Sequence, residues 1–421
     1  MLTALVAGNM IGSGIFLLPS SLARLGSISL YGWIATTLGA FLLAILFAKM
    51  SLWIPKAGGP YAYAEAILGR YMGFQTAYSY WIAIWVGNAA IALAFAGYMQ
   101  VFIPFLLSPL QSCLLAITAV WIVTLVNIFG ARAAGFLQLV TTICKLIPIF
   151  LVAIIGWFYF NPYYITQSFN VSGQSNFSAF SSSVSLTLWA FIGVESATAS
   201  SNAVSNPRFN VPVATLLGTA IAALAYISGS IAIMGMIPNS ELAQSSAPFA
   251  LAAAQIFGQG GEYIVAIGAA LSCFGCLNGW VLLQGQIPMN AAEDRLFPTL
   301  FAKRNRHDIP ANAVILTSVF ISLLLLLTIS PSLVKQFEIV ILIAVLTNLL
   351  PYLYTSIAAL VTIHLHHKSN HKYWLYQIIA FLAGLYALYA IASCGTQTLL
   401  FGLAFLVTSI PLYYYLKKHN Q

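Results

Sequence analysis

Charge is what this sequence lacks most. Only 6% of its 421 residues are Asp, Glu, Lys or Arg, and 61% are hydrophobic, whereas a soluble domain carries about 25% charged residues. So few charges exclude a water-soluble fold. Apolar stretches of about 20 residues, the length of a transmembrane helix, recur along the chain. Alternating segments of about 10 residues, which a transmembrane barrel requires, are missing. The composition therefore predicts an all-α integral membrane protein.

Cysteine and histidine are also scarce. The chain has five cysteines and six histidines, and Cys273 and Cys276 have the spacing of a redox or zinc pair. They lie in an apolar stretch without a second pair, which predicts small packing residues. No His or Asp falls within a predicted span, so the sequence offers neither the metal centre nor the nucleophile–base pair of a membrane enzyme. We expect no enzyme activity, no metal and no cofactor.

Twelve apolar segments are long enough to cross a bilayer. The first has only about ten residues ahead of a glycine-rich interruption, which predicts that residues are missing before Met1. The predicted spans cover about 2–24, 29–54, 75–104, 112–130, 134–160, 179–202, 211–237, 262–290, 311–330, 337–362, 374–393 and 397–416.

The basic residues predict the orientation of these spans. With the N-terminus in the cytoplasm, thirteen of the 16 Lys and Arg residues fall on the inner side, while Arg24 and Lys335 fall outside and Lys145 lies within a span. Because inner loops carry the excess of Lys and Arg, both termini are predicted to be cytoplasmic in a bacterial inner membrane. These short loops account for the net charge of +8, so nucleic acid is not an expected partner.

Two spans are interrupted by small and polar residues, at 8–16 and at 189–197. A helix broken at membrane depth leaves backbone groups unpaired, and such breaks persist only where those groups line a cavity or meet a ligand. A matched pair of broken helices in two parts of a chain points to the binding site of a transporter. The two breaks therefore predict a substrate site near the middle of the bilayer.

The spacing of the breaks predicts an internal repeat. They fall in the first and sixth spans, and an odd number of spans per repeat gives the two copies opposite topology. Within a single membrane transport domain, 1–421, we expect a first inverted repeat at 1–160, a second at 179–362, and two additional helices at 374–416.

The polarity of the breaks suits an α-amino acid. Glycines at 12 and 14 let the backbone leave helical geometry, and the half-helix that follows presents free N–H groups to an anion, with the Ser13 hydroxyl beside them. The half-helix that ends near Met10 presents free carbonyls to an ammonium group. Carbonyls of Trp189 and Ile192 in the second break add further acceptors.

Several motifs resemble the amino acid–polyamine–organocation superfamily, and its basic amino acid/polyamine antiporter family in particular. The run Ala7–Pro19 resembles the opening motif of that superfamily, and 189–197 resembles its sixth helix. The segments 206–212 and 350–354 also fit. The resemblance covers nearly the whole chain. It implies twelve helices in a five-plus-five inverted repeat, with discontinuous helices 1 and 6.

The resemblance also implies roles for individual residues. Trp280 stacks on the substrate side chain, Asn88 bonds its far end, and Trp189 forms the near gate. The backbone around the first break and at the second holds the α-carboxylate and α-ammonium groups. The substrate-binding residues so implied are Met10, Ile11, Gly12, Ser13, Gly14, Ile84, Asn88, Trp189, Ile192, Trp280 and Leu342, and the far gate comprises Tyr80, Glu195 and Tyr352.

Two of these positions depart from the family pattern. In members that carry arginine, the positions matching Ile84 and Leu342 are small and polar and help to hold the guanidinium group. Both are aliphatic here, and each unsatisfied buried polar group costs about 1–3 kcal/mol. A long aliphatic amine or a less polar amino acid fits these residues better than arginine does.

Two charged residues lie deep in predicted spans, where such residues are costly and default to functional roles. Glu195 follows the second break, where it could attract a cation, bind a proton or serve as a structural hydrogen-bonding partner. Lys145 is similar to a lysine that stands near the sodium position of sodium-coupled relatives in some superfamily members. It either takes part in proton coupling or extends to the cytoplasmic surface.

The combined expectation is a secondary transporter that exchanges an amino acid for its decarboxylated amine, as in arginine/agmatine-type antiport, by alternating access. A proton-coupled amino acid symporter of the same superfamily is the alternative, favoured by Lys145 and by the aliphatic Ile84 and Leu342. A nutrient sensor would need a soluble signalling domain, and no loop is long enough for one. The expected partners are an amino acid or amine and the lipid bilayer, and a homodimer is left open.

Overall fold

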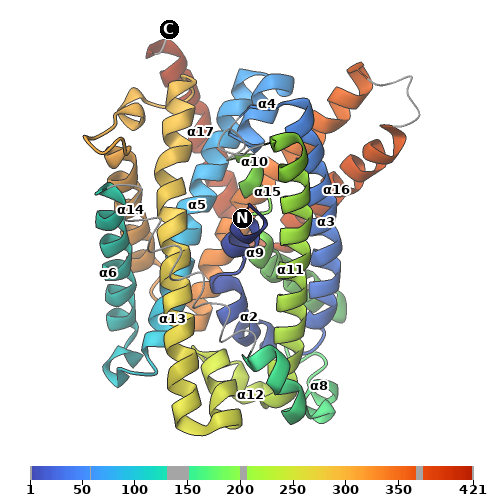
Figure 1. Ribbon diagram of the computed structural model, residues 1–421, viewed down its shortest axis with the longest axis vertical. Coiled ribbons are helices and arrows are strands. Elements are labelled where there is room, and N and C mark those ends of the chain that lie inside the picture. The colour runs from blue at the N-terminus through green and yellow to red at the C-terminus, as the bar shows by residue number, and fades with distance from the viewer. Residues whose placement is uncertain (1, 57, 130–150, 200–205, 367–372, 420–421) are drawn as a thin grey trace.

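The computed structural model describes residues 2–56, 58–129, 151–199, 206–366 and 373–419. Throughout these ranges the chain forms a bundle of helices, most of them roughly parallel to the long axis of the molecule (Figure 1). No strand occurs in them. The predicted all-α fold is confirmed.

Among the described residues, nine helical stretches are long and apolar enough to cross a membrane. They are α3 (Ser29–Trp53), α5 (Arg70–Met99), α6 (Pro109–Ile128), the stretch Asn176–Thr198 that holds α9 (Asn176–Phe191) and α10 (Ser196–Ala199), α11 (Pro207–Met236), α13 (Pro248–Glu293), α15 (Leu333–His366), α16 (Trp374–Ser393) and α17 (Thr396–His419).

Two further predicted spans correspond to shorter apolar helices. The first span is divided into α1 (Leu2–Met10) and α2 (Ser13–Ala23), and the ninth is α14 (Ala311–Leu327). The predicted fifth span, 134–160, lies mostly outside the described residues, as does Lys145. Its last part forms a π-helical turn at Leu151–Ile155 and a 3₁₀ turn at Gly156–Tyr159.

The short elements gather at the two ends of the bundle. α8 (Pro162–Gln167) and α12 (Asn239–Leu242) lie at one end, and α4 (Pro60–Leu68) and the C-terminus lie at the other (Figure 1). Both members of the first pair come from predicted outer loops, and both members of the second from predicted inner segments. The helices therefore alternate in direction as the predicted spans require. Short 3₁₀ turns at Pro104–Leu107 and Thr299–Ala302 complete the connections.

The eighth predicted span, 262–290, lies within α13, which runs from Pro248 to Glu293. α13 consists of two helical segments joined across a kink at Gly258, where φ is +68° and ψ is −166°. The segment after the kink contains the whole predicted span, and the shorter segment before it lies in a predicted outer loop.

The middle of the bundle is built around α5. In an apolar stretch of 18 residues of α5, 83% of the residues are buried. In the corresponding stretches of α16 and α17, 22% and 17% of the residues are buried. α5 packs along both α13 and α15. The residues that α5 turns toward its neighbours, including Tyr80, Ile84 and Asn88, are therefore enclosed by protein and not by lipid.

Close contact between α3 and α9 generates a prediction for stability. A Cβ atom at Gly32 would lie 2.1 Å from the Ser183 Oγ and 3.1 Å from its backbone carbon. Overpacking of this kind costs about 1–3 kcal/mol, so Gly32→Ala should lower the thermal unfolding midpoint of the purified protein in detergent. Gly384→Ala in α16 is the matched control, because its Cβ would meet only Ser356 at 3.5 Å. Equal midpoints for the two variants would contradict this packing.

Candidate functional site

The first predicted break is present in the structure. α1 ends at Met10 and α2 begins at Ser13, and Gly12 between them has non-helical φ and ψ of −144° and −135°. The Ile11 amide still donates to the Ala7 carbonyl at 2.7 Å, which closes the last turn of α1. The N–H groups of the first turn of α2 have no partner within their own helix, and the positive end of its dipole lies at residues 12–14.

The second predicted break is also present. α9 ends at Phe191, α10 begins at Ser196, and Gly193 in the turn between them has a φ of +107°, which favours glycine. The Trp189 carbonyl accepts from the Ile192 amide at 3.3 Å, which leaves a lone pair free. The Ala190 carbonyl accepts from the Tyr226 hydroxyl at 2.9 Å, so it is already satisfied.

The two breaks lie against each other. A Cβ atom at Gly14 would lie 3.0 Å from both the Cα and the Cβ of Ala190, so only glycine permits this approach without a shift. The Trp189 indole donates to the Ser13 hydroxyl at 3.3 Å. Segments nearly 180 residues apart in the sequence therefore form one site, as the broken helices predicted.

Two very small adjoining cavities occupy this site, with volumes of about 10 and 20 Å³, so the side chains are closely packed around it in this conformation. They share the walls Ile91, Trp189, Ile192 and Trp280. We call the one at the first break the backbone cavity, and its remaining lining residues are Asn9, Met10, Gly12, Ser13, Gly14 and Cys276. We call the other the side-chain cavity, and its remaining lining residues are Tyr80, Ala83, Ile84, Gly87 and Asn348.

A fully buried carboxylate stands beside the side-chain cavity. Glu195 accepts hydrogen bonds from the Tyr80 hydroxyl at 2.8 Å, the Tyr352 hydroxyl at 2.6 Å and the Gly193 amide at 3.2 Å. Hydrogen bonds to a charged group are among the strongest in proteins, and three of them offset part of the cost of burying this carboxylate. The structure brings together the three residues expected at the far gate.

Three residues of the expected set are not brought into the cavities. The Asn88 amide nitrogen donates to the Gln284 Oε1 at 2.6 Å, and Asn88 lines neither cavity. Leu342 is half-buried and also lines neither. Ile11 is buried in the last turn of α1, outside both linings. The remaining expected substrate-binding residues all line one or both cavities.

Sequence reasoning missed several lining residues. Ile91 and Gly87 follow Ile84 on one face of α5 at helical spacing, a signal that could have identified them. Asn9 belongs to the first motif, and its carbonyl accepts from the Trp280 indole at 3.3 Å. Asn348 is a polar residue in an otherwise apolar part of α15, which was itself a signal.

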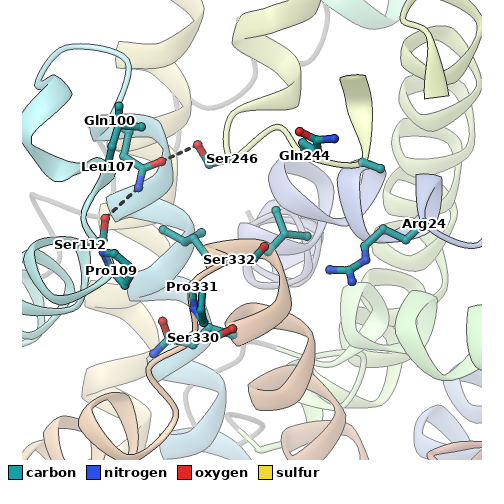
Figure 2. A pocket seen from close by; sticks show the side chains of 14 residues that line it. Arg24, Gln100, Leu107, Pro109, Ser112, Gln244, Ser246, Ser330, Pro331 and Ser332 are labelled. Carbon is teal, nitrogen blue, oxygen red and sulfur yellow. Dashed lines mark hydrogen bonds between the residues drawn. The ribbon is translucent and has the colours of Figure 1, made fainter. Parts of the chain in front are cut away.

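A wider polar cavity opens at the end of the bundle where α12 lies. Arg24 extends toward it from the end of α2, and Gln100 bonds both Ser112 and Ser246 at its rim (Figure 2). Arg24 also forms an ion pair with Glu338 at 3.8 Å. This cavity shares no lining residue with the two central ones, so it is a separate cavity.

An ionic cluster joins elements at the opposite end. The Lys56 ammonium lies 3.3 Å from Glu65 and 3.2 Å from Asp294, and the Tyr61 hydroxyl donates to Asp294 at 3.2 Å. Burial by itself would lower the pKa of Lys56, but the hydrogen bond to Asp294 and the two negative charges raise it overall. Lys56 therefore stays charged at neutral pH and ties the segment before α4 to the end of α13.

The chemistry available at the centre is that of a binding site. It offers backbone donors and acceptors, indole rings and one carboxylate. Across the part of the chain that the structure describes, no three His, Cys, Asp or Glu side chains gather as a metal site would require. Such a site can hold a zwitterion or a cation and release it unchanged.

The Glu195 cluster generates a test by mutation. Tyr352→Phe removes one donor to the buried carboxylate, and a hydrogen bond to a charged group contributes about 1.5–3 kcal/mol. We expect a lower thermal midpoint and slower transport in reconstituted vesicles. Tyr354→Phe is the matched control, two residues along the same helix and only half-buried. Identical behaviour of the two variants would show that the bond to Glu195 contributes nothing.

Comparisons with known proteins identify the family of this chain. The chain is 39% identical to a putrescine transporter, PotE, of Haemophilus influenzae over 95% of this chain and 92% of that protein. It is 40% identical to the Escherichia coli K12 protein of the same name over 95% and 91%, and 38% identical to an E. coli K12 cadaverine/lysine antiporter over 84% and 81%. The amino acid permease family matches residues 1–416. These relatives are transporters and not enzymes. The chain is a multi-pass bacterial membrane protein, and it belongs to the amino acid permease family of the amino acid–polyamine–organocation superfamily.

Proposed function

We propose that this protein exchanges a cationic amino acid for a diamine across the bacterial inner membrane by alternating access. Putrescine and cadaverine, which its relatives are named for, are the diamines that the proposal covers, together with lysine and amino acids of similar length. The observation that carries the proposal is the pair of adjoining cavities. One is lined by backbone at the first break, and the other by aliphatic and indole side chains next to Glu195.

The backbone cavity would hold the end that both substrates share. Carbonyls of Met10, Trp189 and Ile192 would accept from the first ammonium group of either an amino acid or a diamine. The N–H groups at residues 12–14, with the Ser13 hydroxyl, would hold the carboxylate of the amino acid. A diamine has no carboxylate, and water can occupy those donors in its place. One site can therefore serve both directions of the exchange.

The side-chain cavity would hold the aliphatic chain and the far cation. Ile84 and Ile91 contact methylene groups, and Trp280 offers an aromatic face, where a cation–π contact is worth about 0.5–2 kcal/mol. An aliphatic residue at Ile84 supports an alkylamine over a guanidinium, which needs more polar partners. The far-gate cluster, Tyr80, Glu195 and Tyr352, supplies negative charge beside this cavity.

The proposal includes the two inverted repeats expected from the sequence. The two broken helices would belong to inverted repeats at 1–160 and 179–362, with 374–416 outside them, and the low burial of α16 and α17 supports that division. Cytoplasmic termini would put the polar cavity at Arg24 on the outer side, where it would receive substrate. Asn88, Ile11 and Leu342 would act from outside the cavity walls. A homodimer and the absence of nucleic acid stay predictions.

A proton-coupled symporter is the second candidate. The wall at Ile84 suits a less polar amino acid as well as an alkylamine, and Lys145 would titrate during transport in this case. A symporter accumulates its substrate in empty vesicles when a proton gradient is imposed, whereas an antiporter needs substrate on the opposite side. The direction of the driving force therefore separates the two candidates.

Counterflow in reconstituted vesicles tests the proposal. Vesicles loaded with lysine or putrescine should take up labelled putrescine or cadaverine at least tenfold faster than empty vesicles, with or without a pH gradient. Vesicles loaded with a neutral amino acid such as leucine are the matched control and should behave as the empty ones do. Uptake into empty vesicles that depends only on a proton gradient would reject exchange and establish symport. Uptake of neutral amino acids alone would reject the cationic substrate.

A further inference from the structure

We propose that Asn348 binds the far ammonium group of the substrate and so selects alkylamines with two cationic ends. This inference rests on the proposed function and refines it, because it assigns a specific side chain to the second cation. Asn348 lies in α15, one helical turn before Tyr352. It stands in the wall of the side-chain cavity and is only 1% exposed.

The Asn348 side chain carries an unused acceptor. Its Oδ1 and Nδ2 atoms are both buried and have no hydrogen-bond partner, and an ammonium group can satisfy the oxygen. A buried acceptor without a partner is destabilising, and native proteins retain few of them without a reason. Because this residue lines a cavity at the candidate substrate site, a donor on the substrate is the partner that fits.

The other polar groups around the same cavity are already engaged. The Tyr80 hydroxyl donates to Glu195 at 2.8 Å. The Trp189 and Trp280 indoles donate to Ser13 and to the Asn9 carbonyl, both at 3.3 Å. Among the described lining residues, the Asn348 Oδ1 is therefore the side-chain acceptor left free for a ligand.

Asn88, the residue expected to bind the far end, lines neither cavity. Its amide nitrogen donates to Gln284, whose own amide donates to Ser318 at 3.0 Å, and this chain of hydrogen bonds joins α5, α13 and α14. The buried Asn88 Oδ1 also has no hydrogen-bond partner. Asn348, and not Asn88, combines a free acceptor with a place in a cavity wall, so the polar contact to the substrate is assigned to α15.

The geometry also favours an ammonium over a guanidinium. The two cavities share four wall residues, so an extended substrate held at the first break reaches toward Asn348. An ammonium has three donors on one atom, and one can go to the amide oxygen. A guanidinium has five donors in a rigid fork, and the aliphatic Ile84 and Ala83 beside Asn348 satisfy none of them. Glu195, behind the Tyr80 hydroxyl, adds negative charge for either cation.

Binding measurements with matched ligands test this assignment. Purified full-length protein is titrated with cadaverine and with n-pentylamine, which has the same carbon chain and one amine. Asn348→Leu should weaken cadaverine binding about tenfold, because one hydrogen bond to a cation is lost, and should change pentylamine binding less than twofold. Asn348→Asp keeps an acceptor and should bind cadaverine at least as tightly as the unaltered protein.

A neighbouring residue provides the control. Thr347→Val alters a buried side chain whose hydroxyl bonds the Ile343 carbonyl of its own helix at 2.9 Å, and it should leave both affinities unchanged. Equal losses for cadaverine and pentylamine in Asn348→Leu, or no loss for either, would overturn the assignment while the exchange proposal stands. If the unaltered protein binds neither cadaverine nor lysine, the proposed function itself fails, and the assignment fails with it.

Discussion

Backbone groups buried in a bilayer must find partners, and this constraint shapes the centre of the protein. Two helices stop within the membrane region, and each interruption frees donors and acceptors that lipid cannot satisfy. Some are satisfied internally, since Tyr226 donates to the Ala190 carbonyl and the Gly193 amide donates to Glu195. Those at residues 12–14 border a cavity instead. The broken helices pack against the long helices α3, α5, α11, α13 and α15, which keep lipid away from the breaks.

The same constraint accounts for the buried carboxylate. Within the described residues Glu195 pairs with no cation, and it relies on two tyrosine hydroxyls and one backbone amide. The amide belongs to Gly193, in the turn that interrupts the helix, so the break and the charge support each other. Tyr80 comes from α5 and Tyr352 from α15. One side chain therefore connects the second broken helix to two of the helices that enclose the site.

Features encoded locally were predictable from the sequence, and side-chain directions were not. The breaks follow from glycines at 12, 14 and 193, because backbone conformation depends on a few neighbouring residues. Span positions follow from apolar length, although the short helical segment of α13 before the kink at Gly258 was not predicted. Asn88 and Leu342 were expected in the cavity because of a family pattern. Successive side chains along a helix point in directions about 100° apart. Packing between helices therefore decides which side chains reach the ligand. Asn348 was missed for the same reason.

The two sides of the central site differ in the bonds that hold them closed. On one side the Trp189 indole and the Ser13 hydroxyl share a neutral hydrogen bond, which contributes about 0.5–1.5 kcal/mol. On the other side Tyr80 and Tyr352 bond a carboxylate, and each such bond contributes about 1.5–3 kcal/mol. In the proposed exchange, parting the second set would cost more, so a substrate would have to contribute more binding energy to open that side. A cation near Glu195 would do so, because its charge would compensate the carboxylate as the tyrosines leave.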